Sequence, residues 1–474
     1  MGEVPLDRAT ALAALPPEWP DDPLPAIRAH LKHSHRKVVV LDDDPTGTQT
    51  VHGIPVLTEW PVAVLREELT NDLPAFYILT NSRSLPADAA AAMNAEIGER
   101  LVQAARQADR DFVVVSRSDS TLRGHFPAEV SALANALGGQ FDAWIINPFF
   151  LEGGRYTLNN VHYVAEGERL IPAGQTEFAR DAVFGYRASN LCEWVAEKTG
   201  GRISAADVAS ITVEDIRCGG PERVAELLSR LSGGRICIVN AASVRDQQVF
   251  VLGLLQAEEG GRRFLYRTAA SFVQARAGLE ARPLLERRDF DLSAGRGGLV
   301  VVGSYVPRST AQVAAVLTQP DVCSIEVPVD SLLHDSHRGP AISRIAREVD
   351  RRLREDCIVM LYTSRELVTA QDTARNLDIG RRISEGLVAI VRAVPTRPRF
   401  LVAKGGITSS DVATRGLDVK RAMVMGQILP GVPVWQLGPE SRCPGMAYVV
   451  FPGNVGGSAS LVEVLQTLSP KSGA

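Results

Sequence analysis

The sequence lacks any apolar run long enough to cross a membrane, and its charges nearly balance. No stretch of the 474 residues reaches the roughly 18 apolar residues of a spanning helix. The segment before Arg36 has no apolar core of signal-peptide length. With 51 Lys and Arg against 55 Asp and Glu, no strong field attracts nucleic acid or an anionic membrane. We therefore expect a cytoplasmic protein with small-molecule partners, no nucleic acid and no membrane; a homodimer stays open.

The sequence also lacks the cysteine and histidine patterns of a zinc site or a disulfide framework. No C-x-x-C pair occurs, and no histidine cluster lies near a cysteine. Scattered cysteines are typical of a reducing compartment, so we expect them to be reduced. The six are Cys192, Cys218, Cys237, Cys323, Cys357 and Cys443.

What is present is an alternation of short apolar runs with polar loops and helical stretches. This alternation is typical of parallel sheets with crossover helices, so it predicts an α/β fold. Runs in the first half are 38–41, 76–80, 112–116 and 143–146. Runs in the second half are 299–302, 358–362, 400–403 and 448–451.

The length predicts more than one hydrophobic core. We place a domain boundary at 286–298, which is charged, then glycine-rich, and has no periodicity. We predict two α/β domains, each with a largely parallel sheet flanked by helices, and an active site in the cleft between them. The stretch 156–200 is interpreted as an irregular excursion, either functional or a covering flap. The predicted parts are an N-terminal arm over 1–36, a first domain over 37–290 and a second over 291–474.

Three consecutive acids follow the first predicted strand. In open α/β sheets ligands bind beyond the carboxyl ends of the strands, so Asp42, Asp43 and Asp44 occupy a predicted site. Three adjacent carboxylates repel one another and need a metal, a basic side chain or a proton; a proton held this way produces a general base. Thr46 and Gly47 would let backbone amides approach a bound group. The alternative for this stretch is a solvated turn.

The other strand ends of the first half carry hydroxyl, carboxylate and guanidinium groups. Arginine binds carboxylates through two hydrogen bonds, and aspartate accepts hydrogen bonds from sugar hydroxyls, so this set suits a polyhydroxy acid. The alternative for each arginine is a surface or interdomain ion pair. His125 and His162 are interpreted as hydrogen-bonded side chains rather than metal ligands. The candidate substrate-binding residues are Thr46, Gly47, Ser82, Arg83, Asp119, Ser120, Thr121, Arg123 and Arg155, with Arg117 nearby.

The strands of the second half end in small residues. Glycines after a strand expose backbone N–H groups to phosphate, although such a glycine is often an ordinary turn. No loop has the Walker pattern or G-x-G-x-x-G, so dinucleotide binding has no support. Lys404 suits either a phosphate contact or a salt bridge. The candidate nucleotide-binding residues are Ser304, Lys404, Gly405, Gly406, Ile407, Thr408, Gly453, Asn454, Gly456 and Gly457.

An acid-binding half and a phosphate-binding half together predict phosphoryl transfer from a nucleotide to a hydroxyl. We expect ATP and Mg²⁺ as cofactors and a carboxylate that takes the hydroxyl proton. Asp43 is the first candidate for this base, and Asp42 and Asp44 are the alternatives.

The motifs resemble those of the four-carbon acid sugar kinase family over about 37–457. They are Asp42-Asp43-Asp44-Pro45-Thr46-Gly47, Ser82-Arg83, Asp119-Ser120-Thr121-Leu122-Arg123-Gly124, Lys404-Gly405-Gly406-Ile407-Thr408 and Gly453-Asn454-Val455-Gly456-Gly457. The resemblance implies an ATP-dependent kinase of tetronates or 3-oxo-tetronates, with an N-terminal sugar-acid domain and a C-terminal nucleotide domain. It also implies a sugar site lined by Asp43 and its neighbours with Arg83, Asp119 and Arg123, and an ATP site formed by Ser304, Gly405–Thr408 and Gly453.

Two other functions stay open from the sequence. Asp42, Asp44 and Thr46 fit the D-x-D-x-T motif of haloacid-dehalogenase-like phosphatases, with Asp42 as nucleophile and Asp44 as acid/base. That function leaves the Asp119–Gly124 motif and the glycine loops unexplained. The third hypothesis is a non-catalytic ligand-binding protein.

Overall fold

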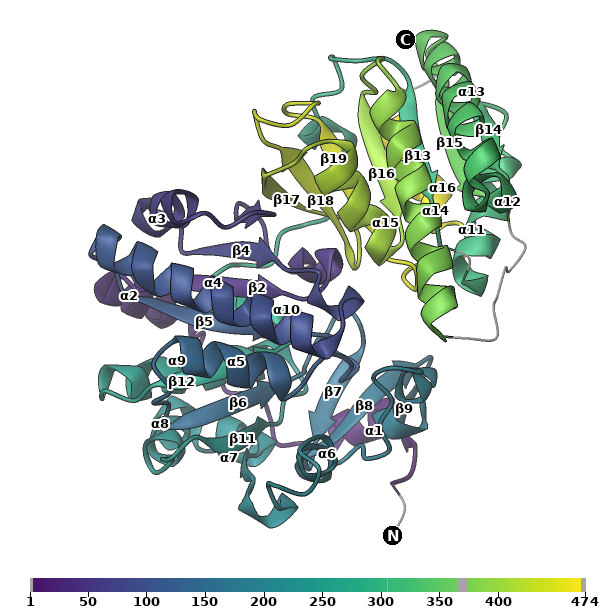
Figure 1. Ribbon diagram of the computed structural model, residues 1–474. Helices are drawn as coiled ribbons and strands as arrows, with labels where there is room; N and C mark the ends of the chain where they lie inside the picture. Colours follow the sequence, from purple (N-terminus) through teal and green to yellow (C-terminus); the bar gives the residue numbers. More distant parts are fainter. Residues whose placement is uncertain (1–2, 305, 365–372, 470–474) are drawn as a thin grey trace. The chain divides into compact units, whose positions relative to one another are not determined.

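The computed structural model describes residues 3–304, 306–364 and 373–469 (Figure 1). The chain forms two compact units, which are described separately. Unit 1 contains Met1–Ile54 and Glu59–Ala281, and unit 2 contains Pro55–Thr58 and Arg282–Ala474. Among the helices of the described residues, none has the length and apolar character needed to cross a membrane.

The main sheet of unit 1 is parallel throughout and orders its strands β10-β11-β6-β12-β5-β2-β4. Its central strands are runs of Val, Ile, Leu and aromatic residues, which suit a sheet covered on both faces. Val38, Val39 and Val40 of β2 are fully buried. In chain order the strands are β2 Lys37–Asp42, β4 Ala75–Leu79, β5 Phe112–Arg117, β6 Ala143–Asn147, β10 Ala209–Ile211, β11 Arg235–Val239 and β12 Phe264–Thr268.

Apart from α1 Arg8–Ala13 and α6 Leu191–Lys198, the helices of unit 1 pack in two groups. The first group is α3 Val62–Thr70, α4 Ala87–Ala108 and α5 Ala128–Ala136. The second is α2 Leu24–Ser34, α7 Val213–Arg217, α8 Gly220–Ser229, α9 Val244–Glu259 and α10 Ala270–Arg276. Helix α9 begins with a capping box between Ser243 and Asp246, which satisfies backbone N–H groups at its start.

The expectation of an irregular excursion was wrong for its first part. The chain there forms an antiparallel sheet in the order β1-β9-β8-β7. The strands are β1 Leu6–Asp7, β7 Arg155–Leu158, β8 Val161–Glu166 and β9 Arg169–Pro172. The N-terminal segment therefore joins this sheet and continues into α1 Arg8–Ala13. Leu12 and Leu15 pack against the buried cluster that contains Tyr156 and Leu170.

The sheet of unit 2 orders its strands β3-β17-β18-β19-β16-β13-β15-β14. The strands from β19 to β14 are parallel, and those from β3 to β19 are antiparallel. Strand β3, though early in the chain, pairs with β17. The strands are β3 Pro55–Leu57, β13 Gly298–Val302, β14 Val322–Val327, β15 Ile358–Thr363, β16 Phe400–Lys404, β17 Arg421–Leu429, β18 Val432–Leu437 and β19 Ala447–Phe451.

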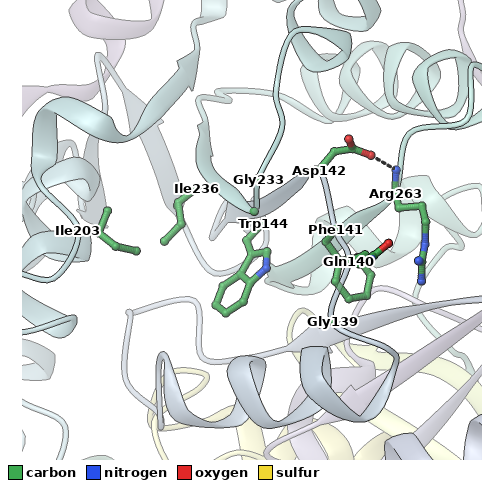
Figure 2. A pocket seen from close by; sticks show the side chains of 10 residues that line it. Gly139, Gln140, Phe141, Asp142, Trp144, Ile203, Gly233, Ile236 and Arg263 are labelled. Atoms are coloured by element: carbon green, nitrogen blue, oxygen red, sulfur yellow. Dashed lines mark hydrogen bonds between the residues drawn. The ribbon is translucent and has the colours of Figure 1, made fainter.

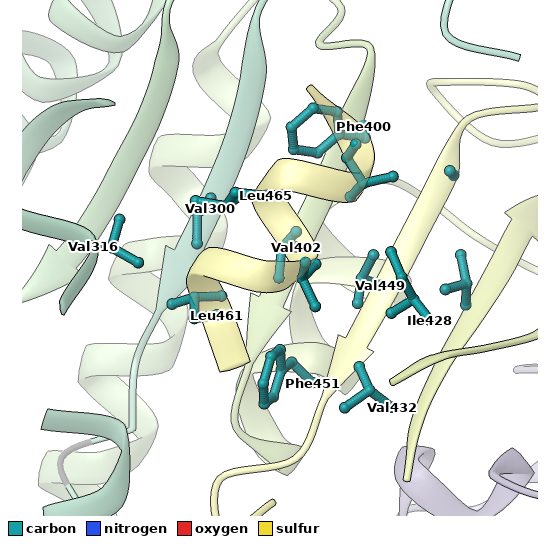
Figure 3. Packing of buried hydrophobic residues seen from close by; sticks show 14 of the residues in the cluster. Val300, Val316, Phe400, Val402, Ile428, Val432, Val449, Phe451, Leu461 and Leu465 are labelled. Carbon is teal, nitrogen blue, oxygen red and sulfur yellow. The ribbon is translucent and has the colours of Figure 1, made fainter. Parts of the chain in front are cut away.

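The core of unit 2 joins its sheet to α11 and α16 (Figure 3). Val300, Val402 and Val449 from three parallel strands pack with Leu461 and Leu465 of α16. Phe290 and Leu292, from the segment expected as a boundary, belong to the same core. The helices of unit 2 are α11 Pro307–Leu317, α12 Val329–Leu333, α13 Asp335–Arg354, α14 Thr373–Ala393, α15 Gly406–Asp411 and α16 Ser460–Leu468.

Candidate active site

The acidic loop of unit 1 leaves the carboxyl end of β2 and folds back tightly over it. Asp42 is the last residue of β2, and Asp44 caps the 3-10 turn Pro45–Thr48 by accepting a hydrogen bond from the Thr46 N–H at 2.9 Å. A Cβ at Gly47 would lie 2.1 Å from Oδ2 of Asp42, so glycine is required there. Asp42 and Asp43 are only 1% and 4% exposed, which contradicts the solvated-turn alternative.

Two arginines compensate the charge of this loop. Arg117, the last residue of β5 and the register partner of Asp42, lies 3.2 Å from Oδ1 of Asp42 and 3.8 Å from Oδ1 of Asp43. Arg83, in the turn Ser82–Ser84 after β4, lies 3.2 Å from Asp43 and 2.9 Å from Asp44. Basic side chains therefore neutralise much of the three-carboxylate repulsion.

Arg83 also connects this loop to the second acidic motif. Its Nη1 lies 3.3 Å from Oδ1 of Asp119, whose other oxygen accepts a 2.8 Å hydrogen bond from Nε of Arg123. Arg123 in turn lies 3.6 Å from Asp181 and 5.2 Å from the ring centroid of Phe178. The structure thus brings the predicted residues of three strand ends into one charged cluster.

Most of the remaining predicted residues of unit 1 lie in the same loops, and their side chains form hydrogen bonds with neighbours in those loops. Thr46 Oγ1 donates to Asp44, Thr121 Oγ1 donates to Asp119, and the Ser82 hydroxyl accepts from Thr80 at 3.1 Å. Ser120 is held through its carbonyl, which lies 2.8 Å from Nε2 of His162. Arg155 lies 5.4 Å from the centroid of Phe178, so it borders the cluster.

The balance between burial and the arginine partners separates the pKa values of the four carboxylates into two kinds. Burial raises the pKa of Asp42 to about 7 and that of Asp43 to about 6, against the opposing effects of Arg117 and Arg83. Burial acts in the same direction on Asp44 and Asp119, but their arginine partners and hydrogen bonds prevail and lower both pKa values. Asp43 differs further because its buried Oδ2 has no hydrogen-bond partner among the described residues. Its carboxylate is thus the best placed to accept a proton.

One buried side chain near the cluster, Arg267, was missed by sequence reasoning, whereas His162 was interpreted there as a hydrogen-bonded side chain. Arg267 of β12 donates to the carbonyl of Arg123 at 3.0 Å, and an arginine within an apolar strand was the signal that could have found it. His162, with Nδ1 3.0 Å from the Thr157 hydroxyl, supports the loop rather than a metal. Burial lowers its pKa to about 4, so it is neutral. Among the described residues, no group of three His, Cys, Asp or Glu is placed to hold a metal ion.

The glycine loops of unit 2 approach one another closely. A Cβ at Gly303 would lie 2.4 Å from Oγ1 of Thr408, and one at Gly405 would lie 3.1 Å from Cβ of Ser304. A Cβ at Gly453 would lie 3.3 Å from the Ser304 hydroxyl oxygen. The ends of β13, β16 and β19 therefore form a single glycine-lined surface, as their adjacent places in the sheet require.

Side chains of α11 hold the loop after β19. The Ser309 hydroxyl donates to the carbonyl of Gly453 at 3.1 Å, and the Gln312 amide donates to the carbonyls of Val455 and Gly457 at 3.0 and 2.8 Å. The Arg308 guanidinium donates to the Asn454 carbonyl at 2.7 Å. This part of the surface is thus fixed from the side of α11.

Lys404 does not have the environment expected of a direct phosphate ligand. Its side chain is fully buried, and Nζ donates to the carbonyl of Pro452 at 2.6 Å. It lies 4.1 Å from the ring centroid of Phe451, and burial lowers its pKa to about 7. The salt bridge considered as its alternative role is also absent among the described residues. Lys404 therefore supports the Pro452–Gly453 loop from below.

A separate hollow lies at the amino ends of β6, β11 and β12 (Figure 2). Asp42 lies at the opposite, carboxyl ends of the strands of this parallel sheet. The volume of the hollow is about 670 Å³, and Phe141, Trp144 and Ile236 face it with Arg263 beside them. None of the predicted site residues lines it.

Sequence comparison identifies both units. Residues 38–276 match the model of a sugar-binding N-terminal domain, and residues 299–461 match that of a nucleotide-binding C-terminal domain. A sugar-binding domain followed by a nucleotide-binding domain, together with the activity of a relative named D-erythronate kinase, identifies a phosphotransferase of the kinase class. Specifically, the chain belongs to the four-carbon acid sugar kinase family.

Individual relatives are distant. A D-erythronate kinase of Heliobacterium modesticaldum (strain ATCC 51547 / Ice1) is 25% identical over 415 residues, covering 84% of this chain and 87% of that protein. A Salmonella typhimurium LT2 protein superposes with a TM-score of 0.66 at 18% identity, covering 90% of this chain and 98% of its own. Protein HI1011 of Haemophilus influenzae superposes with a TM-score of 0.59 at 18% identity, covering 91% of this chain and 100% of its own. The two solved structures show a shared fold.

Proposed function

We propose that the protein transfers the γ-phosphoryl group of ATP to a hydroxyl of a four-carbon sugar acid, a tetronate or 3-oxo-tetronate, with Asp43 as general base. The observation that carries this proposal is the free Oδ2 of Asp43, buried among arginines at the carboxyl end of β2. A buried acceptor oxygen on a carboxylate whose pKa is raised to about 6 suits a base that works near neutral pH.

The surroundings of Asp43 support the choice of substrate. Arg83 and Arg123 present guanidinium groups, and Asp44 and Asp119 present acceptor oxygens, so the cluster offers partners to both carboxylate and hydroxyl groups. The relative from Heliobacterium modesticaldum is a D-erythronate kinase, which is a kinase of a four-carbon acid. The substrate hydroxyl would donate its proton to Oδ2 of Asp43, while Arg83 and Arg117 stabilise the ionised carboxylate beforehand.

The residues of unit 2 fit a nucleotide. Gly303, Gly405 and Gly453 let the three loops approach one another closely, because a Cβ at each would press on Ser304 or Thr408, and the hydroxyls of these two residues lie among the backbone of the loops. We assign Ser304, the Gly405–Thr408 loop, the Gly453–Gly457 loop and Lys404, through its support of Gly453, to the nucleotide site. ATP supplies the phosphoryl group when bound.

Magnesium belongs to the proposal through the nucleotide. Because the described residues gather no three-ligand metal site, Mg²⁺ would be held mainly by phosphate oxygens, as is common for this ion. No step is assigned to it.

The phosphatase alternative is disfavoured by the same geometry. A nucleophilic Asp42 would need an oxygen free to attack a phosphoester, whereas its Oδ1 pairs with Arg117 and Gly47 lies against its Oδ2. Its burial instead suits the role of holding Arg117 in place.

The test is a screen of four-carbon sugar acids with Mg²⁺ and ATP that measures ADP formation. We expect at least one acid to be phosphorylated, with background ADP release in its absence. Phosphomonoester hydrolysis without nucleotide would instead support the phosphatase. Joint thermal stabilisation by ATP and an acid, without ADP, would support a non-catalytic binding protein.

A further inference from the structure

Arg267 is a buried cation whose surroundings differ from those of Arg83, Arg117 and Arg123. It is 4% exposed, and its guanidinium carbon lies 5.0 Å from the ring centroid of Trp194 and 5.5 Å from that of Phe126. Its Nη2 donates to the carbonyl of Arg123. In the part of the chain that the structure describes, no carboxylate lies within ion-pairing distance of Arg267. Arg83, Arg117 and Arg123, by contrast, all pair with aspartates.

A buried guanidinium without a carboxylate partner is energetically costly. Its hydrogen bond to a neutral carbonyl and its aromatic contacts offset part of that cost. Burial lowers the pKa of Arg267, and Asp43 is the largest opposing influence. An anion arriving from solution would compensate the charge that the protein leaves unpaired.

Gly124 places Arg267 beside the proposed base. A Cβ at Gly124 would lie 3.3 Å from Oδ2 of Asp43 and 3.7 Å from Nη2 of Arg267. The two functional atoms therefore flank the same glycine, whose φ of +117° also disfavours any side chain. The proposed proton acceptor and the unpaired cation therefore both border the position that a side chain at Gly124 would occupy.

We infer that Arg267 is a specificity-determining residue that binds the carboxylate of the sugar acid, so that a hydroxyl further along the short carbon chain reaches Asp43. This inference rests on the proposed function and deepens it. Arginine binds a carboxylate through two parallel hydrogen bonds, so it fixes the orientation of the substrate as well as its charge. The enzyme would then discriminate against neutral compounds of the same length.

A purely structural role predicts something different. If Arg267 only holds the Arg123 carbonyl and packs on Trp194, its loss impairs charged and neutral substrates alike. The decisive quantity is therefore the preference for an acid over its neutral carboxamide, expressed as a ratio of kcat/KM values. If the carboxamide reacts too slowly, its inhibition constant against the acid gives the same comparison, and dissociation constants from calorimetry give it without turnover.

The test compares Arg267→Gln with the wild type and with a control variant, Arg263→Gln. Arg263 directly precedes the strand that contains Arg267, and its guanidinium stacks on Phe141 at the amino ends of the strands (Figure 2). We expect Arg267→Gln to lower kcat/KM for the acid about 100-fold or more, mainly through KM, and to change the carboxamide value less than about threefold. Arg263→Gln should keep the wild-type preference.

An acid-to-carboxamide ratio that stays at its wild-type value in a folded Arg267→Gln would overturn the inference. If that variant is insoluble, Arg267→Lys keeps the charge but loses the two-pronged geometry, and its ratio should fall about tenfold. A wild type that binds and phosphorylates no four-carbon acid would reject the proposed function instead, so the two failures are distinct.

Discussion

Asp43 combines a buried, unpartnered carboxylate oxygen with two flanking arginines, and this combination makes a direct prediction about its amide variant. Asp43→Asn keeps the shape but cannot take a proton, so kcat should fall by about 10²- to 10⁴-fold, the usual contribution of a general base. ATP affinity, measured by calorimetry, should stay within about twofold because the substitution lies in unit 1. Asp142→Asn, at the amino ends of the strands of the same sheet, is the matched control. Normal turnover by Asp43→Asn would transfer the role to Asp42 or Asp44.

The same residue predicts a pH dependence. Burial raises the pKa of Asp43 from 3.8 to about 6, so kcat/KM should decrease as the pH falls through about 6 and level off above it. The effect of this group on stability has the opposite sign, because its raised pKa favours folding most below pH 3.8 and that contribution is lost as the pH rises through 6. Titration of Asp43 therefore cannot produce the acid limb by unfolding the protein. A pH–rate profile with thermal melts at each pH checks this, and a limb near pH 4 would contradict it.

At the scale of elements, the loop after β16 carries a further prediction. Gly405 has φ of +111°, where a side chain is strained, and a Cβ would press on Ser304. Gly405→Ala should raise the KM for ATP at least about tenfold while leaving the dissociation constant of the sugar acid nearly unchanged. Gly339→Ala is the control, because an added Cβ meets no atom within 4 Å there and α13 favours alanine. Equal damage to both ligands would show that the loop has another role.

Elements with a strong local signal were predictable, and those defined by distant partners were not. Strands β2, β4, β5 and β6 are short runs of apolar, mostly β-branched or aromatic residues, and the α/β fold prediction is confirmed. Strand β14 is half-buried and was missed. The pattern of β17 is interrupted by Gly426, and its pairing with β3 joins segments far apart in the chain, which no local pattern indicates.

The residues of the candidate site also fall into those that the local sequence predicts and those that depend on distant partners. The Asp and Arg motifs were visible because they directly follow predicted strands, and the structure brings their side chains together. Arg267 lies within a strand, and its hydrogen-bond partner Arg123 is more than a hundred residues away along the chain. His162 also lies within a strand, and its partner Ser120 is about forty residues away. The burial that turns Lys404 toward the Pro452 carbonyl is likewise a tertiary effect. Assignments of individual residues to substrate and nucleotide stay predictions.

For the whole molecule, the proposal requires that the two units bind different ligands. Amide hydrogen exchange on the intact protein tests this, because a ligand that orders a loop slows exchange there. A tetronate should protect 42–49, 82–84 and 117–124 in unit 1, and ATP should protect 404–409 and 452–457 in unit 2. The segment 348–354, at the end of α13, is an internal reference that should not respond to either ligand. Protection of 42–49 by ATP alone would contradict the assignment, because it would place the nucleotide against the aspartates and leave the glycine surface without a ligand. Protection by each ligand in its own unit, combined with turnover when both are present, would establish that phosphoryl transfer joins the two sites during the catalytic cycle.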